Sequence, residues 1–235
     1  MDQNEIKAIY MLQSENVRHL AGVLTSLKRE INAHIQRNNS SEISQRTKML
    51  ALVYSVWSEA QFLQIAFTPN GFMYTEISAI KKEKNANGIV DGWKLMLSKA
   101  MAKVTTSDDN ADMLARLEQL TSLIDEFIGG PSLIRNKIAH GQWARALNRP
   151  FTAENTELTA ELNDLDPVVI LRQQQVHKFF GHIIRDLVQS PINGFHQHYW
   201  TNIVKLEHFL NKSKNWNLET KRSLLKTKPE MSVRK

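Results

Sequence analysis

Cysteine is absent from the 235-residue chain, and every function that needs a thiol is therefore excluded. These functions include disulfide bridges, thiolate metal sites and cysteine nucleophiles, and a chain without cysteine fits the cytoplasm, which is the expected location. No run of about 18 apolar residues occurs, so no membrane-spanning helix is expected. The first residues are polar and lack the apolar core of a secretory signal peptide.

Common metal and nucleotide motifs are also missing, namely HExxH, the Walker glycine loop and GxGxxG. The eight histidines do not form a metal-binding pattern. His196 and His198 are two residues apart, which points them away from each other on a helix. His177 and His182 have no Asp or Glu at a spacing that would complete a site. We therefore predict no metal and no cofactor.

Positive charge is concentrated near the C-terminal end of the chain. The whole chain carries a net charge of +6, and residues 201–235 contain nine Lys or Arg and three Glu, a surplus that equals the total. A basic balance favours acidic partners, nucleic acid among them. The final segment, "KRSLLKTKPEMSVRK", is interpreted either as an arm that contacts nucleic acid or as an ordinary solvated terminus.

Helical periodicity dominates the first half of the chain. Apolar residues recur at steps of three and four from Val17 to Ile35, which predicts one face of a long helix. After the polar break "RNNSSE", Ser40 and Ser41 are candidate caps of a second helix. The apolar face expected for that helix comprises Leu52, Val56, Ala60, Leu63 and Phe67.

The remaining pattern is also helical. We expect helices over about 73–84 and 92–104, a third with Leu120 and Ile124 on its apolar face, a break at "GGPS", a long connection over 147–167 and a strong helix over 168–189. A terminal helix follows in "YWTNIVKLEHFL". No alternating β pattern stands out, so the predicted fold class is an all-α helical bundle. The predicted domains are residues 1–190 and a C-terminal helical extension with a basic tail, 191–235.

One stretch, "LIRNKIAHGQW", contains charged residues within an otherwise apolar helical segment. Arg135 and His140 have an Arg-x4-His spacing, which also joins Arg29 to His34 and Arg172 to His177, so spacing alone does not select it. Only the stretch around Arg135 has Asn directly after the Arg and "HGQW" at its end.

The geometry of an ideal helix constrains this motif. Asn136 and His140 are four residues apart and share a face, whereas Arg135 lies about 140° from His140. The Arg and His side chains converge only if Arg135 reaches around the helix, if the helix opens at Gly141, or if a second subunit contributes.

The "RNKIAHG" segment resembles the R-N-x-x-x-H signature of the HEPN superfamily, whose members are small all-helical domains. Many of them are metal-independent ribonucleases of toxin–antitoxin and antiviral systems. The resemblance, which extends over roughly residues 1–190, implies a homodimer whose motif helices face each other and line one RNA-binding cleft. It also implies a possible antitoxin or sensor protein as a partner.

The resemblance also implies roles for individual residues. Arg135 would bind the scissile phosphate, His140 would transfer protons, and Asn136 would orient the site. Glu59 from the second helix is a candidate helper. The RNA backbone would be held by Lys137, Arg145 and Arg149.

Two other readings stay open. In the first, the chain is a non-catalytic HEPN-like module that binds RNA or a protein. In the second, the motif is purely structural, so that Asn136 and His140 satisfy backbone groups at a helix end. Arg135 would then pair with an acid such as Asp125 or Glu126.

Overall fold

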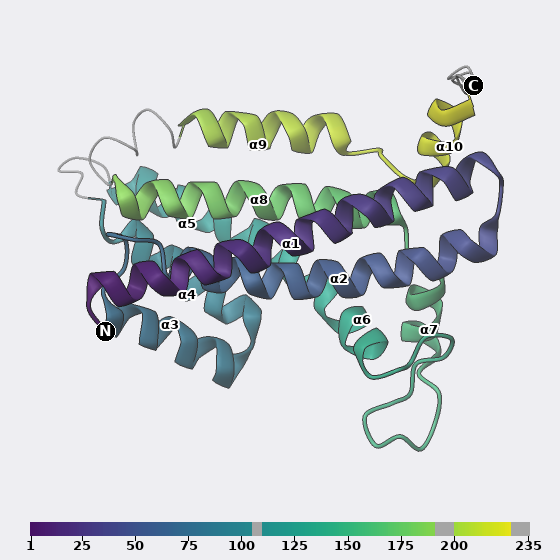
Figure 1. Cartoon of the computed structure of the whole chain (residues 1–235), viewed down its shortest axis with the longest axis horizontal. Coiled ribbons are helices and arrows are strands. Elements are labelled where there is room, and N and C mark those ends of the chain that lie inside the picture. The colour runs from purple at the N-terminus through teal and green to yellow at the C-terminus, as the bar shows by residue number, and fades with distance from the viewer. Residues whose placement is uncertain (105–109, 191–199, 227–235) are drawn as a thin grey trace.

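The computed structural model describes residues 1–104, 110–190 and 200–226 and confirms an all-α helical bundle. Within these ranges the only β feature is an isolated bridge between Leu147 and Glu154. Figure 1 shows the arrangement of the helices. Their bounds are α1 Gln3–Gln36, α2 Ser40–Ala66, α3 Tyr74–Asn87, α4 Ile89–Met101, α5 Asn110–Ile124, the π-helix η1 Asp125–Gly129, α6 Gly130–Ala139, α7 Thr156–Asn163, α8 Pro167–Gln189, α9 Trp200–Ser213 and α10 Leu218–Lys226.

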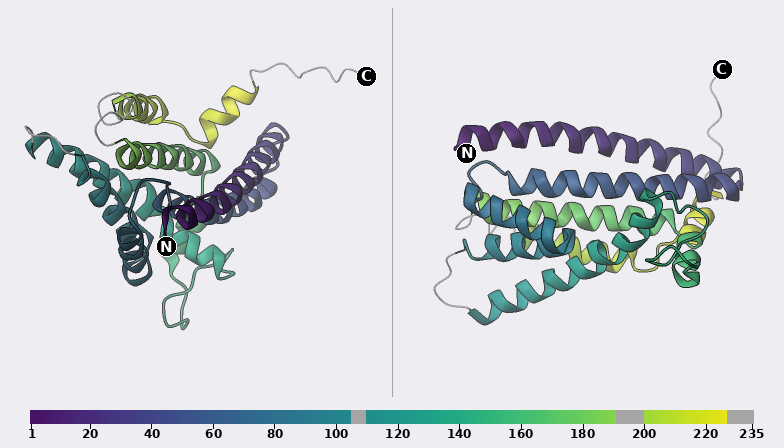
Figure 2. Two further views of the ribbon diagram at one scale, coloured as in Figure 1. Left: turned by 60° about the vertical axis from the view of Figure 1, so that its left-hand side comes forward. Right: turned by 90° about the horizontal axis from the view of Figure 1, so that it is seen from below.

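The two long N-terminal helices form an antiparallel pair along one side of the molecule (Figures 1 and 2). A capping box between Asp2 and Glu5 begins α1. Its buried residues include Leu24, Leu27, Ile31 and Ile35, as the period predicted. The cap of α2 is Asn39, whose side chain accepts a hydrogen bond from the Glu42 backbone N–H. The expected caps Ser40 and Ser41 lie inside the helix, so that prediction was wrong by one residue.

The buried face of α2 differs from the expected one. Tyr54, Trp57 and Phe62 are buried, whereas Val56, assigned to the apolar face, is 49% exposed. The physical reason is that α2 packs against both α1 and α8, so its apolar residues occupy most of its circumference. Under these conditions the hydrophobic period no longer identifies a single inward face.

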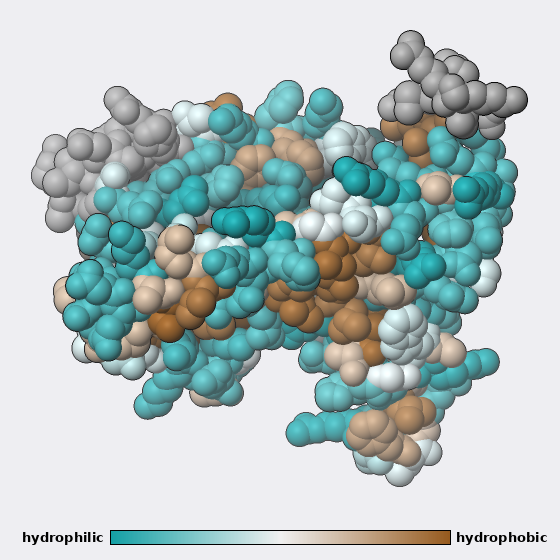
Figure 3. Space-filling view, viewed as in Figure 1, coloured by the Kyte–Doolittle hydropathy of each residue, from teal (hydrophilic) through white to brown (hydrophobic). Residues whose placement is uncertain are grey.

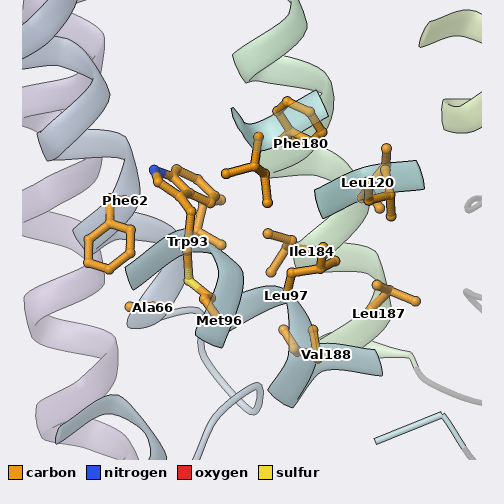
Figure 4. Close-up of a cluster of buried hydrophobic side chains, with 14 of the residues drawn as sticks. Phe62, Ala66, Trp93, Met96, Leu97, Leu120, Phe180, Ile184, Leu187 and Val188 are labelled. Carbon is orange, nitrogen blue, oxygen red and sulfur yellow. The ribbon is translucent and has the colours of Figure 1, made fainter. Parts of the chain in front are cut away.

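The main core lies where α2, α4, α5 and α8 meet, and α9 adds Ile203 and Leu206 to it. Figure 4 shows Trp93 at its centre, with Phe62 on one side and Phe180 and Ile184 of α8 on the other. A second core cluster joins α1 and α2 to Ile134 and Ile138 of α6, Leu162 of α7 and Ile170 of α8. This second cluster fixes the motif helix to the bundle.

Two expectations about the middle of the chain were wrong. The "GGPS" segment does not break the helix, because α5, η1 and α6 follow one another without interruption. The extra residue in the π-turn shifts the helix register just before the motif. The expected long connection over 147–167 contains α7, which Asn155 caps by accepting a hydrogen bond from the Leu158 N–H.

The C-terminal helices pack on the bundle. Helix α9 lies beside α8 (Figures 1 and 2), and Asn202 donates a hydrogen bond to Asp186 across that contact. Residues 191–199 and 227–235 lie outside the described residues, so the domain division at residue 190 and the role of the basic tail stay predictions. In the described part of the chain, no helix is long and apolar enough to cross a membrane.

Candidate functional site

Arg135 is held in place by an acid from α2. One of its terminal nitrogens lies 3.5 Å from Oε1 of Glu59, and Oε2 of the same carboxylate lies 2.7 Å from Nζ of Lys84. Asp125, a partner considered from the sequence, instead pairs with Lys94 at 2.6 Å. The Arg135 side chain is 19% exposed. One carboxylate therefore ties the motif helix α6 to α3, with α2 between them.

The surface is indented between α3 on one side and α6 with its following loop on the other (Figure 3). Because Lys84 comes from α3 and Arg135 from α6, the shared Glu59 carboxylate joins the elements that border this indentation. Both cations are only partly buried. This side of the motif combines two positive groups with one negative group.

Asn136 and His140 lie on the outer side of α6. Both residues are exposed, and neither side chain has a hydrogen bond or ion pair within the described ranges. His140 is the C-cap, and its backbone N–H donates to the carbonyl of Asn136. Gly141 then turns the chain with a φ of +78°, which favours glycine. The two side chains are therefore available to a molecule outside this chain.

A single chain does not unite the three expected catalytic residues. Arg135 points toward Glu59 and the interior, whereas Asn136 and His140 face solvent. No contact joins Arg135 to His140 among the described residues. The helix ends at Ala139 and the chain turns at Gly141, but that turn leaves His140 outside the Arg135 contacts. Of the three arrangements considered from the sequence, the structure of one chain shows neither of the two that need no second subunit.

Lys137 has a structural contact. Its ammonium group donates a hydrogen bond to the carbonyl oxygen of Leu147 and fastens the loop that follows α6. The same loop is held by the Trp143 indole N–H, which donates to the Ile138 carbonyl at 3.0 Å, and by Lys48, which donates to the Trp143 carbonyl. Lys137 was expected to hold RNA, and in this structure it orders the loop.

The two arginines of the loop differ in availability. Arg145 donates to both oxygens of Glu154 at 3.0 Å, and these hydrogen bonds are the main reason that the pKa of the Glu154 carboxyl is lowered. Arg149 is exposed and has no such partner within the described chain. It lies beside Phe151, an aromatic residue that is 67% exposed. Arg149 is thus the loop cation that is free to meet an anion.

A pocket of about 500 Å³ opens beside Arg135, between α2, α6, α7 and α8. We call it the α2–α8 pocket. Its lining is mixed, with Ala51, Ile134 and Ile170 among the apolar residues. Its polar lining includes Ser55, Ser58, Arg135, Glu161, Asp164 and Asp166. Neither Asn136 nor His140 lines it.

A buried polar group unforeseen from the sequence lies behind this pocket. The hydroxyl of Tyr54, a residue that lines the pocket, lies 3.4 Å from Nδ1 of His177 and 3.5 Å from the carbonyl of Phe127 in η1. Burial lowers the pKa of His177 to about 3, so the ring is neutral. Burial also raises the pKa of Tyr54, and the charge of Arg135 partly opposes that shift.

His177 is enclosed by aromatic rings, with its centroid 5.3 Å from that of Trp57 and 4.9 Å from that of Trp93. From the sequence, we considered His177 only as a metal ligand or as part of an Arg-x4-His pair. Its position on the buried stripe of α8, four residues before Gly181, was the signal that could have identified it. Arg172 does not pair with it, since its Nε donates to Ser213 at 3.0 Å.

Within the described part of the chain, no group of three or more His, Cys, Asp or Glu residues is placed to hold a metal ion. Comparison with known proteins adds no relative, because no protein family, curated protein or solved structure matches the chain.

Proposed function

We propose that the "RNKIAH" segment is the active site of a HEPN-like, metal-independent endoribonuclease that acts as a homodimer. The observation that carries this proposal is the exposure of Asn136 and His140, which lie together on one face of α6 without any partner in the described chain. Polar side chains that serve only to cap a helix would be bonded to backbone groups. These two are instead presented outward, next to an arginine that is already oriented by Glu59.

In the proposed reaction, His140 removes the proton of a ribose 2′-hydroxyl or donates one to the leaving 5′-oxygen. The 2′-oxygen attacks the adjacent phosphorus, the bond from phosphorus to the 5′-oxygen breaks, and a 2′,3′-cyclic phosphate remains. Arg135 stabilises the negative charge that develops on the phosphoryl oxygens, because its guanidinium is always cationic and offers forked donors. Asn136 orients the phosphate, and Arg149 attracts the RNA backbone.

The homodimer supplies what one chain lacks. Arg135 and His140 point to different sides of α6, and in the proposed dimer a second copy packs against this helix so that its His140 faces the first copy's Arg135. Helix α6 lies at the edge of the bundle, where another chain has access to it (Figure 1). The biological role that goes with this proposal is a cytoplasmic toxin or antiviral effector, restrained by an antitoxin or sensor protein.

A second candidate function is a HEPN-like module that binds RNA or a protein without cleaving RNA. The observation that favours it is the structural use of two motif residues. Arg135 pairs with Glu59, and Lys137 fastens the loop through the Leu147 carbonyl. In a module of this kind, Asn136 and His140 would contribute only hydrogen bonds to the partner.

Cleavage of total RNA in EDTA separates these functions. We expect wild-type protein to yield fragments ending in 2′,3′-cyclic phosphate, and Arg135→Ala and His140→Ala to lose at least about a hundredfold in rate. His19→Ala is the matched control, because His19 is an exposed histidine on α1, outside the motif. Equal circular dichroism spectra verify folding. Unchanged cleavage by His140→Ala contradicts the proposal, and RNA binding without any cleavage supports the module.

A further inference from the structure

The α2–α8 pocket has the dimensions of a ligand site. Its volume of about 500 Å³ falls within the usual range for small-molecule pockets, roughly 300–1,000 Å³. Its lining combines an apolar surface with polar and charged groups that can orient a ligand. The pocket lies beside the proposed ribonuclease residue Arg135, but the proposal below does not depend on RNA cleavage.

The charge of the pocket is opposite to that of the protein. Three carboxylates and one guanidinium line it, although the chain as a whole carries +6. The guanidinium, Arg135, is already paired with Glu59, which lies outside the lining. Glu59 also pairs with Lys84, so Arg135 keeps part of its positive charge. The three lining carboxylates still outnumber the one guanidinium, and the pocket therefore attracts cations rather than phosphate.

Two of the three carboxylates are available to a ligand. Asp166 is fully engaged, because one oxygen accepts from the Val168 and Val169 N–H groups and the other from the Leu218 N–H. Glu161 and Asp164 are exposed and have no side-chain partner among the described residues. They lie at the C-terminal end of α7, where the helix dipole adds to their negative potential. The last turn of α7 has no basic residue that would offset this potential.

A serine of α2 supplies a polar group inside the pocket. Ser58 lines the pocket and is only 6% exposed, yet its hydroxyl has no hydrogen-bond partner in the described part of the chain. Other helical hydroxyls nearby bond to the carbonyl four residues earlier, as Thr47 does to Ile43. The Ser58 hydroxyl is therefore available to a polar group of a molecule bound in the pocket.

We propose that the α2–α8 pocket binds a small organic cation, a primary amine with an apolar body. The apolar body packs between Ala51, Ile134 and Ile170. The ammonium group is attracted by Glu161 and Asp164 at the mouth. A ligand that also carries a hydroxyl or carbonyl group reaches Ser58.

Phenethylamine, phenethyl alcohol and 3-phenylpropionate are suitable probes, because they share an aromatic body and differ in charge. Calorimetric titration of the full-length protein is expected to give a millimolar or lower Kd for the amine and binding at least about tenfold weaker for the other two. The double variant Glu161→Gln, Asp164→Asn is expected to weaken amine binding by about tenfold. Val169→Trp, at an exposed position of the lining, is expected to block it.

Glu157→Gln is the matched control, because Glu157 is an exposed acid of the same helix that does not line the pocket. It should leave the Kd unchanged, as should His140→Ala, which tests the ribonuclease proposal separately. Equal affinity for the amine and the alcohol overturns the proposal. It is also overturned if Glu157→Gln weakens amine binding as much as the double variant does. Absence of amine binding up to about 10 mM overturns it as well.

Discussion

His177 shows how the environment of one residue sets a property of the whole protein. Its ring is 0% exposed, Nδ1 lies near the Tyr54 hydroxyl, and Nε2 has no partner in the described chain. A charged imidazole in this position would lose its hydration without gaining a counterion. The folded protein therefore keeps His177 neutral far below the pH at which the unfolded chain protonates it.

This difference predicts acid sensitivity. In the unfolded chain the pKa of His177 is about 6.5, and in the folded protein it is lowered to about 3. The stability that this residue contributes is complete above pH 6.5. It is lost as the pH falls toward 3, because only the unfolded state binds the proton. The free energy of unfolding should fall by up to about 1.4 kcal/mol per pH unit in that range.

Urea denaturation of wild type and His177→Leu between pH 7 and pH 4 measures this effect. The variant should show a shallower decline, whatever its stability at pH 7. Burial also lowers the pKa of His182, with Arg185 as a further cause, so His182 contributes in the same direction in both proteins and cancels in the comparison. His19→Ala should keep the wild-type slope. Identical slopes for wild type and His177→Leu would show that His177 is not buried as described.

At the scale of elements, α3 and α4 approach each other closely at Gly92. A Cβ added there would lie 2.8 Å from Cβ of Lys84 and 3.0 Å from Cζ of Phe62. Gly22 of α1 has nothing within 4 Å of the same added atom. The two positions thus form a matched pair, one crowded and one open, both inside helices.

We expect opposite effects from alanine at these positions. Gly92→Ala should destabilise the protein by about 1–3 kcal/mol, because Lys84 and Phe62 must move. Gly22→Ala should stabilise it by about 0.5–1 kcal/mol, because alanine loses less conformational freedom in a helix. Thermal unfolding followed by circular dichroism measures both. A neutral or stabilising Gly92→Ala would contradict the close packing of α3 on α4.

The helices also show which sequence patterns were sufficient to predict a buried face or a helix end. The stripe from Leu24 to Ile35 identified the inner face of α1 because that helix buries one side only. The face of α2 could not be identified in the same way, since two neighbouring helices cover it. The break expected at "GGPS" failed because the π-helix η1 leads directly into α6, with Gly129 between them in a helical conformation (φ −67°, ψ −55°).

At the scale of the whole molecule, the sequence suggested the motif residues and Glu59 as a helper, whereas the other surroundings of the motif depend on tertiary packing. Residue order suggested Arg135, Asn136 and His140 as candidates, and the 140° separation left three arrangements by which the Arg and His side chains could converge. The partnership of Glu59 with Lys84 and Arg135 joins residues that lie 25 and 76 positions apart, so it depends on tertiary packing. The α2–α8 pocket depends on the meeting of four helices and had no local signal.

The central claim is that Arg135 of one chain works with His140 of another. Arg135→Ala and His140→Ala proteins, each inactive alone, should recover RNA cleavage when they are mixed and allowed to exchange subunits. In the mixed dimer one composite site contains both intact residues, so about a quarter of all sites become active at equal amounts and random exchange. Recovery to that level in EDTA, with size-exclusion chromatography confirming dimers, is the predicted result. Active wild type with no recovery in fully exchanged mixtures would contradict the composite site.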